Sequence, residues 1–263
     1  MIPFLKIIRY FTRYEQYFMR FMFKMIKSEK LYRNRFIRFF PEFISFFAAK
    51  GVRPSIYTLQ ELEKVLNIIY QNHNNSESLA NYGILLRPCP CRDAQRKYSK
   101  NLPNVTDVIF TSNAQSLSKG PNNVFISTDQ LFKKLRQFDD AGLVHLVLGC
   151  CGVDGTGINI CNCHKSVCFV LQAYLARDIK RGITVGPSIA SCNPELCEGI
   201  EKCGKCLTRC IFHARIEKDG KGAVIPENCV GCGLCANTCL STATKMGPRE
   251  HYIERYFPLN ILR

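Results

Sequence analysis

Two runs of cysteines near the C-terminus constrain this chain more than any other feature. The first run is Cys197-x5-Cys203-x2-Cys206-x3-Cys210, and the second is Cys229-x2-Cys232-x2-Cys235-x3-Cys239. Each run has short Cys-x2-Cys turns and supplies the four thiolates that one four-iron cluster needs. Gly204, Gly231 and Gly233 lie in or beside these turns, and glycine tolerates the positive φ angles that tight turns require. The two runs therefore predict two [4Fe–4S] clusters.

Two other uses of paired cysteines compete with this interpretation. A zinc ribbon takes four thiolates for each ion, but four cysteines per run at this repeated spacing fit it poorly. A disulfide framework forms in an oxidising compartment, and the sequence shows no secretory signal peptide. The pattern favours iron–sulfur clusters in a reducing compartment.

The segment from about Gly186 to Gly247 contains an internal repeat around these runs. The residues after Cys210 and those after Cys239 both predict a short helical turn that leads into a strand. With its cysteine spacing, the segment resembles the bacterial two-cluster ferredoxin domain. It departs from that pattern at Ile211 and Leu240, where ferredoxin runs usually have proline.

The ferredoxin resemblance implies a crossed set of ligands, because the fourth cysteine of each run binds the cluster of the other run. The ligands implied for cluster 1 are Cys197, Cys203, Cys206 and Cys239. The ligands implied for cluster 2 are Cys210, Cys229, Cys232 and Cys235.

Composition and charge divide the rest of the chain. The protein has 263 residues, 16 cysteines and a net charge of +15. Residues 1–53 hold twelve Lys or Arg against three Glu, a net charge of +9, so the basic character belongs chiefly to this segment. Eight cysteines lie outside the two runs, and so many thiols favour a reducing compartment and an anaerobic source.

The sequence predicts an α+β protein with four parts. These are a basic aromatic helical arm (1–53), a cysteine-containing α/β domain (54–185), a two-cluster ferredoxin domain (186–249) and a C-terminal tail (250–263).

The arm reads as one or two amphipathic helices from Met1 to about Phe40. Its apolar stripe comprises Phe4, Ile7, Phe11, Tyr14, Phe18, Met22 and Met25. No apolar run approaches the roughly 18–20 residues of a membrane-spanning helix. Three roles stay open: packing on the domain behind it, docking a redox partner protein, or lying on an anionic membrane surface. Nucleic acid fits less well. We expect a cytoplasmic protein, with peripheral contact to the inner membrane face as an option.

The middle region predicts alternating helices and strands. The expected helices are Thr58 to about Gln71, Ser127 or Thr128 to about Ala141, and His164 to about Arg181. The expected strands are 82–87, 105–110, 124–127, 143–148 and 158–163. A capping-box pattern at Thr58 and a terminal Gly142 support the first two helices.

The cysteines of this region predict a third metal centre. Its ligands would be Cys89, Cys91, Cys163 and Cys168, with Cys161 as the main substitute. Buried free thiols, a zinc site or a redox thiol pair are the alternatives. Cys150-Cys151-Gly152 resembles the CCG element of heterodisulfide-reductase-type subunits, without the downstream Cys-x2-Cys at the usual spacing.

A second resemblance extends over roughly residues 82–249. Pro88-Cys-Pro-Cys-Arg92, Ala141–His145 and Ile160–Cys163, followed by two cluster runs, are similar to a poorly characterised family of prokaryotic 4Fe–4S binding-domain proteins. Members commonly have a cysteine where this chain has His164. His145, in an apolar strand, is expected to be a core histidine.

These features favour an electron-transfer protein or oxidoreductase subunit. It would pass single electrons through two [4Fe–4S] clusters, onward to the third centre and then to a partner enzyme. One alternative is a redox enzyme that reduces a substrate at the middle centre, and another is a metallocofactor activation or assembly factor. No flavin, nicotinamide or molybdopterin fingerprint is apparent in the sequence.

Overall fold

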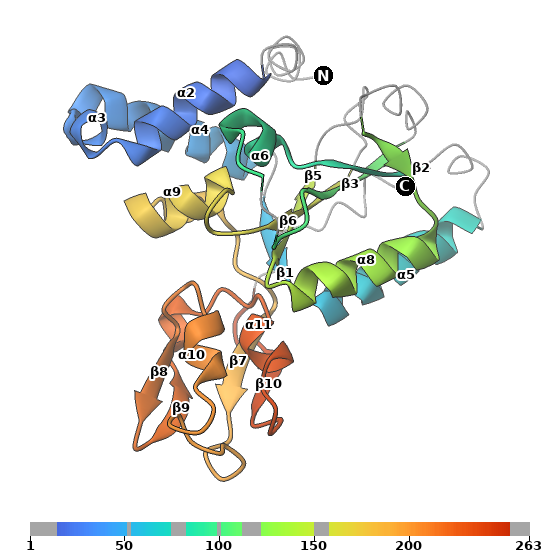
Figure 1. The fold of residues 1–263 in the computed structure, drawn as a ribbon, viewed down its shortest axis with the longest axis vertical. Helices are drawn as coiled ribbons and strands as arrows, with labels where there is room; N and C mark the ends of the chain where they lie inside the picture. Colours follow the sequence, from blue (N-terminus) through green and yellow to red (C-terminus); the bar gives the residue numbers. More distant parts are fainter. Residues whose placement is uncertain are drawn as a thin grey trace. The chain divides into compact units, whose positions relative to one another are not determined.

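The computed structural model describes residues 15–51, 54–74, 83–98, 101–111, 122–149 and 158–252. It has a mixed α/β fold with a six-stranded antiparallel sheet in the order β1-β5-β6-β3-β2-β4 and two sheets of two strands (Figure 1). The predicted mixture of helices and strands is confirmed at this level.

The elements follow one another along the chain with these bounds. The helices are α2 (Glu15–Lys27), α3 (Glu29–Arg33), α4 (Arg35–Gly51), α5 (Leu59–Asn74), α6 (Pro90–Gln95), α8 (Thr128–Asp140), α9 (Phe169–Arg177), η3 (Lys180–Gly182), α10 (Lys205–Arg209), η4 (Pro226–Asn228) and α11 (Leu234–Asn237). The strands are β1 (Ser55–Tyr57), β2 (Gly83–Pro88), β3 (Val105–Thr111), β4 (Val124–Phe125), β5 (Val144–Gly149), β6 (Ile158–Cys163), β7 (Ser188–Cys192), β8 (Arg215–Lys218), β9 (Lys221–Val224) and β10 (Thr244–Pro248).

The chain divides into two compact units, each assembled from separate segments. Unit 1 comprises Met1–Pro54, Asn81–Ile126 and Leu148–Ile183. Unit 2 comprises Ser55–Ala80, Ser127–Val147 and Thr184–Arg263. The four parts expected from the sequence remain predictions beside this interleaved division.

In unit 1, helix α2 packs its apolar side against α6 and α9. Met22 and Met25 are buried, as the apolar stripe predicted, and Phe23 and Ile26 are buried with them. The Nε atom of Arg177 in α9 donates to the carbonyl of Ile26 at 2.6 Å. The stripe residues Phe4 to Tyr14 lie outside the described residues.

The arm contains more helices than the sequence predicted. Ser28 caps α3 by accepting from the N–H of Leu31, and the Asn34 side chain accepts from the N–H of Phe36 at 3.0 Å. These polar side chains satisfy the free N–H groups of a helix start, and they interrupt the run between α2 and α4.

Helix α4 continues through Pro41, where the prediction ended the helix near Phe40. A proline removes one helical N–H and its ring crowds the preceding turn. Two ring contacts offset this: Phe39 lies 5.5 Å from Phe43, and Phe40 lies edge-on at 6.2 Å from Phe21 of α2. Such aromatic pairs stabilise by about 0.5–1.5 kcal/mol each.

The sheet strands of unit 1 bring its cysteines together. Strand β3 pairs with β2 on one side and with β6 on the other, with Asp107 opposite Cys161. Cys89 follows the end of β2 and caps α6, while Cys163 ends β6. The strand predicted over 158–163 is confirmed with the same bounds.

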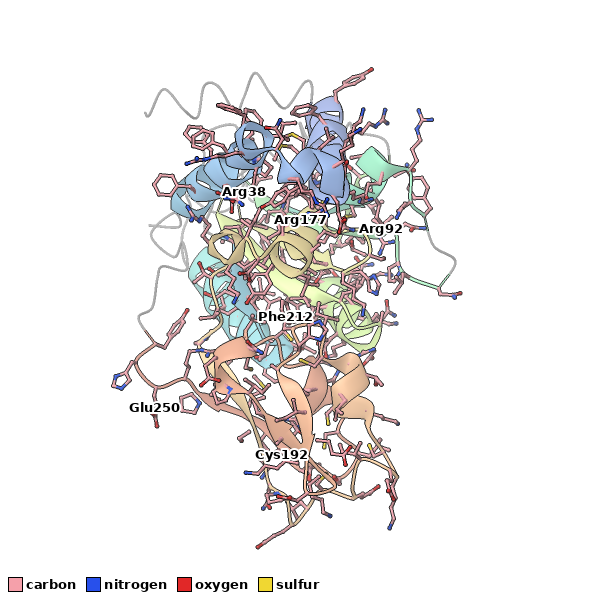
Figure 2. All side chains as sticks on the ribbon, turned by 90° about the vertical axis from the view of Figure 1, so that its left-hand side faces the viewer. Arg38, Arg92, Arg177, Cys192, Phe212 and Glu250 are labelled. Atoms are coloured by element: carbon pink, nitrogen blue, oxygen red, sulfur yellow. The ribbon has the colours of Figure 1, made fainter. Side chains whose placement is uncertain are left out.

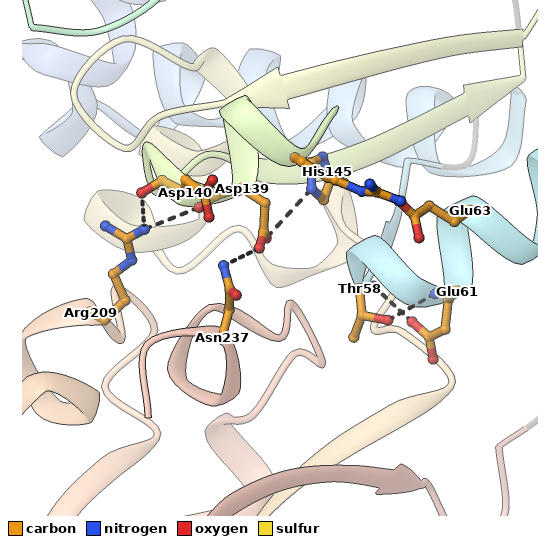
Figure 3. Close-up of polar contacts among 9 residues, drawn as sticks. Thr58, Glu61, Glu63, Asp139, Asp140, His145, Arg209 and Asn237 are labelled. Carbon is orange, nitrogen blue, oxygen red and sulfur yellow. Dashed lines mark hydrogen bonds and ion pairs between the residues drawn. The ribbon is translucent and has the colours of Figure 1, made fainter. Parts of the chain in front are cut away.

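Unit 2 contains the two capped helices that the sequence predicted. Thr58 Oγ1 accepts from the N–H of Glu61 at 3.1 Å, and the Glu61 carboxylate accepts from the N–H of Thr58 at 2.7 Å (Figure 3). Ser127 and Gln130 form the same capping box at the start of α8. Strand β1 pairs antiparallel with β5.

The C-terminal part of unit 2 has a symmetrical strand arrangement. Strand β7 pairs antiparallel with β10, and β8 forms a hairpin with β9 (Figure 1). The short helices α10 and α11 each follow a glycine with positive φ, Gly204 at 54° and Gly233 at 79°. Each helix lies between the third-to-last and last cysteines of its run, so the local structure repeats as the sequence repeats.

Helix α9 is shorter than predicted, because it begins at Phe169 and Cys168 is its N-cap. The ring of His164 bonds Ser166 through Nδ1 at 2.7 Å to Oγ and 3.2 Å to the backbone N–H, which holds a separate turn. Local side-chain bonds of this kind compete with a helix. The helix ends at Asp178 in a left-handed conformation, well before Gly182.

Within the described residues, no helix combines the length and apolar composition needed to cross a membrane.

Candidate metal centres

The four cysteines expected to bind cluster 2 line one cavity in unit 2. Cys229, Cys232 and Cys235 come from the second run, and Cys210 comes from the first. The other walls are mainly apolar and include Ala190, Phe212, Val224, Leu234 and Met246. The fold therefore brings Cys210 together with the three cysteines of the second run, although these follow Cys210 by 19 or more residues in the sequence.

Backbone N–H groups point at the fourth cysteine of each run. Ala214 donates to Cys210 Sγ at 3.3 Å, and Thr244 donates to Cys239 Sγ at 3.3 Å. Bonds of this type stabilise thiolate charge, and around iron–sulfur clusters they tune the reduction potential. A backbone N–H thus contacts the fourth sulfur of both runs, from four residues after Cys210 and from five residues after Cys239.

Glycine is required at the turn of the second run. Gly231 has a φ of 85°, and a Cβ at this position would lie 2.3 Å from the backbone carbonyl oxygen of Ser188. The three glycines expected to ease the cysteine turns all have positive φ.

Of the cluster 1 set, Cys197 and Cys203 precede α10, Cys206 lies in α10, and Cys239 follows α11. The pKa of Cys197 is lowered by backbone N–H groups of Gly222 and Gly199, and Cys239 is close enough for its charge to act on Cys197. Cys206 Sγ borders Gly222, 3.1 Å from the Cβ position of that glycine. Cys203 lies half-buried before Gly204, where its N–H donates to the carbonyl of Gly199.

Burial raises the thiol pKa of Cys232 and Cys235 in the cluster 2 set. It raises the pKa of Cys235 to about 12, although the charge of Arg215 lowers it. Burial also raises the pKa of Cys232 well above its ordinary range. A metal cluster bound here must displace the thiol protons, because thiolates are the ligands.

In unit 1, the five cysteines expected near the third centre form one continuous group. Cys91 lies within hydrogen-bond reach of Cys89 and Cys168, and Cys163 lies within reach of Cys161 and Cys168. They come from three places: the start of α6, strand β6 and the N-cap of α9.

Cys168 is the thiol of this group whose pKa is lowered. Hydrogen bonds from Cys163 and Cys91, with a further one from the backbone of Leu171, lower its pKa to about 5 despite burial. The bond to Cys168 raises the pKa of Cys91, and bonds to Cys161 and Cys168 raise that of Cys163. A negative charge is thus stabilised at the helix N-terminus, as helix dipoles favour.

Cys161 differs from the other four thiols. Its Sγ donates to Asp107 Oδ1 at 3.0 Å, and Asp107 is buried in an ion pair with Arg87 Nε at 2.5 Å. A bond from Cys163 lowers the pKa of Cys161, but burial and the Asp107 charge outweigh it and raise the pKa to about 11. The geometry therefore sets Cys161 apart as a thiol held by Asp107, and Cys89, Cys91, Cys163 and Cys168 stay the expected ligands of the third centre.

Arg92, which follows Cys91 directly, belongs to the Pro88–Arg92 motif, but the sequence assigned it no role. Its side chain is 1% exposed, and its Nε and Nη2 atoms have no hydrogen-bond partner among the described residues (Figure 2). A buried guanidinium without a counter-charge is unfavourable. An anionic metal centre on the neighbouring thiols would supply that charge.

As the side chains stand, no group of three or more His, Cys, Asp or Glu in the described part of the chain could hold a metal ion. The candidate centres rest on the shared cavity, on the N–H bonds to sulfur and on the thiol contacts.

The histidines lie apart from these thiols or serve local structure. His145 is buried in β5, with Nε2 3.6 Å from the Asp139 carboxylate, as expected of a core histidine. His164 stabilises the turn before α9. The Cys150-Cys151-Gly152 element falls outside the described residues.

Comparison with known proteins adds no relative to this description, because no family model, curated protein or solved structure matches the chain.

Proposed function

We propose that the protein transfers single electrons through two [4Fe–4S] clusters in a ferredoxin-like domain formed by residues 186–249. The observation that carries the proposal is the cavity that Cys210 shares with Cys229, Cys232 and Cys235. This combination of thiols from both runs is the one that the crossed ligand set requires. The pairing of β7 with β10 and the β8–β9 hairpin suit two cluster loops related by the repeat.

A third centre on Cys89, Cys91, Cys163 and Cys168 would exchange electrons with these clusters. Its support is the group of thiols in unit 1, with Cys168 ionised and Arg92 as a buried cation nearby in sequence. When bound, the clusters supply reversible one-electron chemistry. The chain's own residues bind them, exclude water and place N–H groups on the sulfurs.

One observation favours a second candidate, a substrate-reducing enzyme. Cys161 holds a proton beside the proposed third centre, and the buried Asp107 fixes its thiol. Such a thiol could protonate a substrate reduced there. The carrier and the enzyme differ in one measurable respect. Only in the enzyme does added substrate take electrons from the reduced third centre and oxidise it. The notion of an assembly factor has no separate support among these contacts.

Anaerobic reconstitution with iron and sulfide tests the metal content. We expect about twelve irons per chain, four for each of three clusters. Replacing Cys168 with serine should lower the content to about eight, and the matched change Cys161→Ser should leave it at about twelve. Electron paramagnetic resonance of the reduced protein should show [4Fe–4S] signals.

Each result has a distinct meaning. About eight irons in the unmodified protein would remove the third centre and keep the two-cluster proposal. A single zinc per run, or no cluster signal at all, would refute the electron-transfer function.

The arm offers a docking surface. Five phenylalanines of α4 are exposed and form what we call the aromatic face: Phe36, Phe39, Phe40, Phe43 and Phe46. Arg35 precedes the aromatic face in sequence, and Arg38 lies within it and forms an ion pair with Glu42 at 3.3 Å. Exposed aromatic rings beside cations suit an anionic membrane surface, which takes rings at its interface and cations at its headgroups. We propose this occupant; a redox partner protein docking at the basic arm is the other outcome of the test given in the Discussion.

A further inference from the structure

Arg215 is a buried cation among the cluster-binding loops. It opens β8 and is 6% exposed. Its Nη2 atom donates to Thr244 Oγ1 at 3.2 Å, while Nε and Nη1 are buried without a hydrogen-bond partner in the described part of the chain. No carboxylate forms an ion pair with it among those residues. The guanidinium is therefore left with unused donors and an uncompensated charge.

The surroundings of Arg215 are sulfur atoms from both cluster sites. The residue lines the cavity that holds the four cluster 2 thiols. On another side, its Nη2 and Cys206 Sγ both border Gly222, at 3.0 Å and 3.1 Å from the Cβ position of that glycine. Cys206 belongs to the cluster 1 set. Cys192, which lies on β7 (Figure 2), is also within hydrogen-bond reach of the guanidinium.

The absence of a side chain at Gly222 leaves room for the Arg215 guanidinium beside Cys206 Sγ. A side chain there would press on both the guanidinium and Cys206 Sγ. The hydrogen bond to Thr244 holds the guanidinium in place from β10. Its planar fork directs several N–H donors at fixed angles, which suits contacts with more than one acceptor.

We propose that Arg215 is a positioning residue that donates to the sulfurs of both clusters and raises their reduction potentials together. This inference rests on the proposed two-cluster function. A cluster held by four thiolates is negatively charged, and it gains a further negative charge on reduction. A fixed cation and N–H donors at the sulfurs stabilise the reduced form more than the oxidised form, so the potential rises. Because one guanidinium borders both sites, both potentials depend on it.

Potentiometric titration followed by electron paramagnetic resonance tests the proposal on the full chain with clusters assembled. We expect Arg215→Gln to lower both potentials. Arg215→Lys, which keeps the charge and loses the fork, should give values between those of Gln and the unmodified protein. Lys218→Gln is the matched control, because it removes an exposed positive charge from the same strand and water screens that charge. It should leave both potentials unchanged.

A second variant covers the case in which Arg215→Gln fails to bind clusters. In Gly222→Ala the arginine remains, but the new methyl group displaces the guanidinium from Cys206. We expect a downward shift of the cluster 1 potential that is larger than that of cluster 2. Unchanged potentials in cluster-loaded Arg215→Gln, or in Gly222→Ala when the former does not load, would overturn the role of Arg215. Absence of clusters from the unmodified protein would refute the proposed function itself.

Discussion

Two non-glycine residues adopt a left-handed backbone conformation in the loops that follow the two cysteine runs. His213 and Thr242 both have a φ of 55°, and each follows the fourth cysteine of its run by three positions. This conformation is uncommon for a β-branched residue such as threonine. The N–H of Ala214, directly after His213, donates to Cys210, and the N–H of Thr244, two residues after Thr242, donates to Cys239. The sequence predicted the glycine turns, but it carried no signal for these two positions, because their strain is set by a sulfur contact.

Gly231 provides a sharp test at the scale of one residue. We expect Gly231→Ala to destabilise the protein by more than about 2 kcal/mol, because left-handed backbone alone costs about 1–2 kcal/mol for a residue with a Cβ. The overlap with the Ser188 carbonyl adds to this cost. The variant should also lose iron from cluster 2, measured beside its thermal unfolding midpoint.

Gly247→Ala is the control for that experiment. Gly247 lies on β10 in the same part of unit 2, and nothing stands within 4 Å of its Cβ position. Its unfolding midpoint and iron content should match those of the unmodified protein. Equal behaviour of the two variants would contradict the geometry described for the Gly231 turn.

At the scale of elements, Arg209 joins a cluster helix to α8 (Figure 3). Its Nη2 atom donates to the carbonyls of Asp139 and Asp140 at 3.0 Å and 2.6 Å. These carbonyls end α8, where the Asp139 carbonyl also accepts from the N–H of Gly142 at 2.8 Å. A cation at this end of the helix opposes the negative end of the helix dipole. Asn237 of α11 adds a hydrogen bond to the Asp139 side chain.

We expect Arg209→Ala to lower the free energy of unfolding by about 1–2 kcal/mol, the range for hydrogen bonds from a charged group that is partly exposed. Urea unfolding followed by far-ultraviolet circular dichroism measures the change. Arg136→Ala, on α8 itself, is the control. The ion pair of Arg136 with Glu63 is exposed and should contribute less than about 1 kcal/mol. A larger loss from Arg136→Ala would contradict the capping role.

The aromatic face of α4 gives a prediction for the arm. We expect the protein to pellet with vesicles that contain phosphatidylglycerol and to remain in solution with phosphatidylcholine alone. The triple variant Phe36→Ser, Phe39→Ser, Phe43→Ser should bind at least about tenfold more weakly, since burial of a single large apolar side chain contributes about 1.5–3 kcal/mol and 1.4 kcal/mol is tenfold.

Tyr98→Ser is the control for the aromatic face, because Tyr98 is an exposed aromatic residue outside the arm. It should bind vesicles like the unmodified protein. Failure of the unmodified protein to bind anionic vesicles would refute the membrane proposal and leave the redox partner as the occupant. Equal binding of the triple variant would show that the phenylalanines are not the contact.

Local signals explain which elements could be predicted. The capping-box pattern at Thr58 predicted the start of α5, and a cap at Ser127 or Thr128 predicted the start of α8, because these side chains themselves form the hydrogen bonds. The predicted start of α9 at His164 was wrong, because the His164 ring bonds Ser166 and holds a separate turn. The predicted end of the arm helix near Phe40 was wrong, because Phe39 contacts Phe43 across Pro41 and Phe40 contacts Phe21 of α2. Both errors arise from side-chain contacts that periodicity does not contain.

For the whole molecule, the sequence could not predict how segments combine. Unit 2 takes β1, α5, α8 and the C-terminal cluster region from three separate stretches. The thiols of unit 1 likewise come from the end of β2, from β6 and from the N-cap of α9. The cysteine spacing within one run can be recognised in the sequence. Whether cysteines from distant segments meet depends on how the strands between them pair. Asp107 stands opposite Cys161 through such register, and it sets that thiol apart.

The crossed ligand set makes a prediction that concerns the whole cluster region. Replacing Cys210 with alanine should remove cluster 2, whose other ligands belong to the second run, and lower the iron content by about four per chain. The cluster of the first run should keep its signal in electron paramagnetic resonance. Cys239→Ala should have the converse effect and remove cluster 1.

Cys192→Ala separates this arrangement from a general sensitivity to lost thiols. Cys192 lies on β7 outside both runs, and its removal should leave the iron content of both clusters intact. Under an uncrossed arrangement, Cys210→Ala would instead abolish the cluster of its own run, and the surviving signal would depend on Cys229, Cys232 and Cys235. The two arrangements thus differ in which double variant loses both clusters of residues 186–249. Cys210→Ala with Cys232→Ala should spare one of these two clusters if the ligands cross, and it should spare neither if they do not.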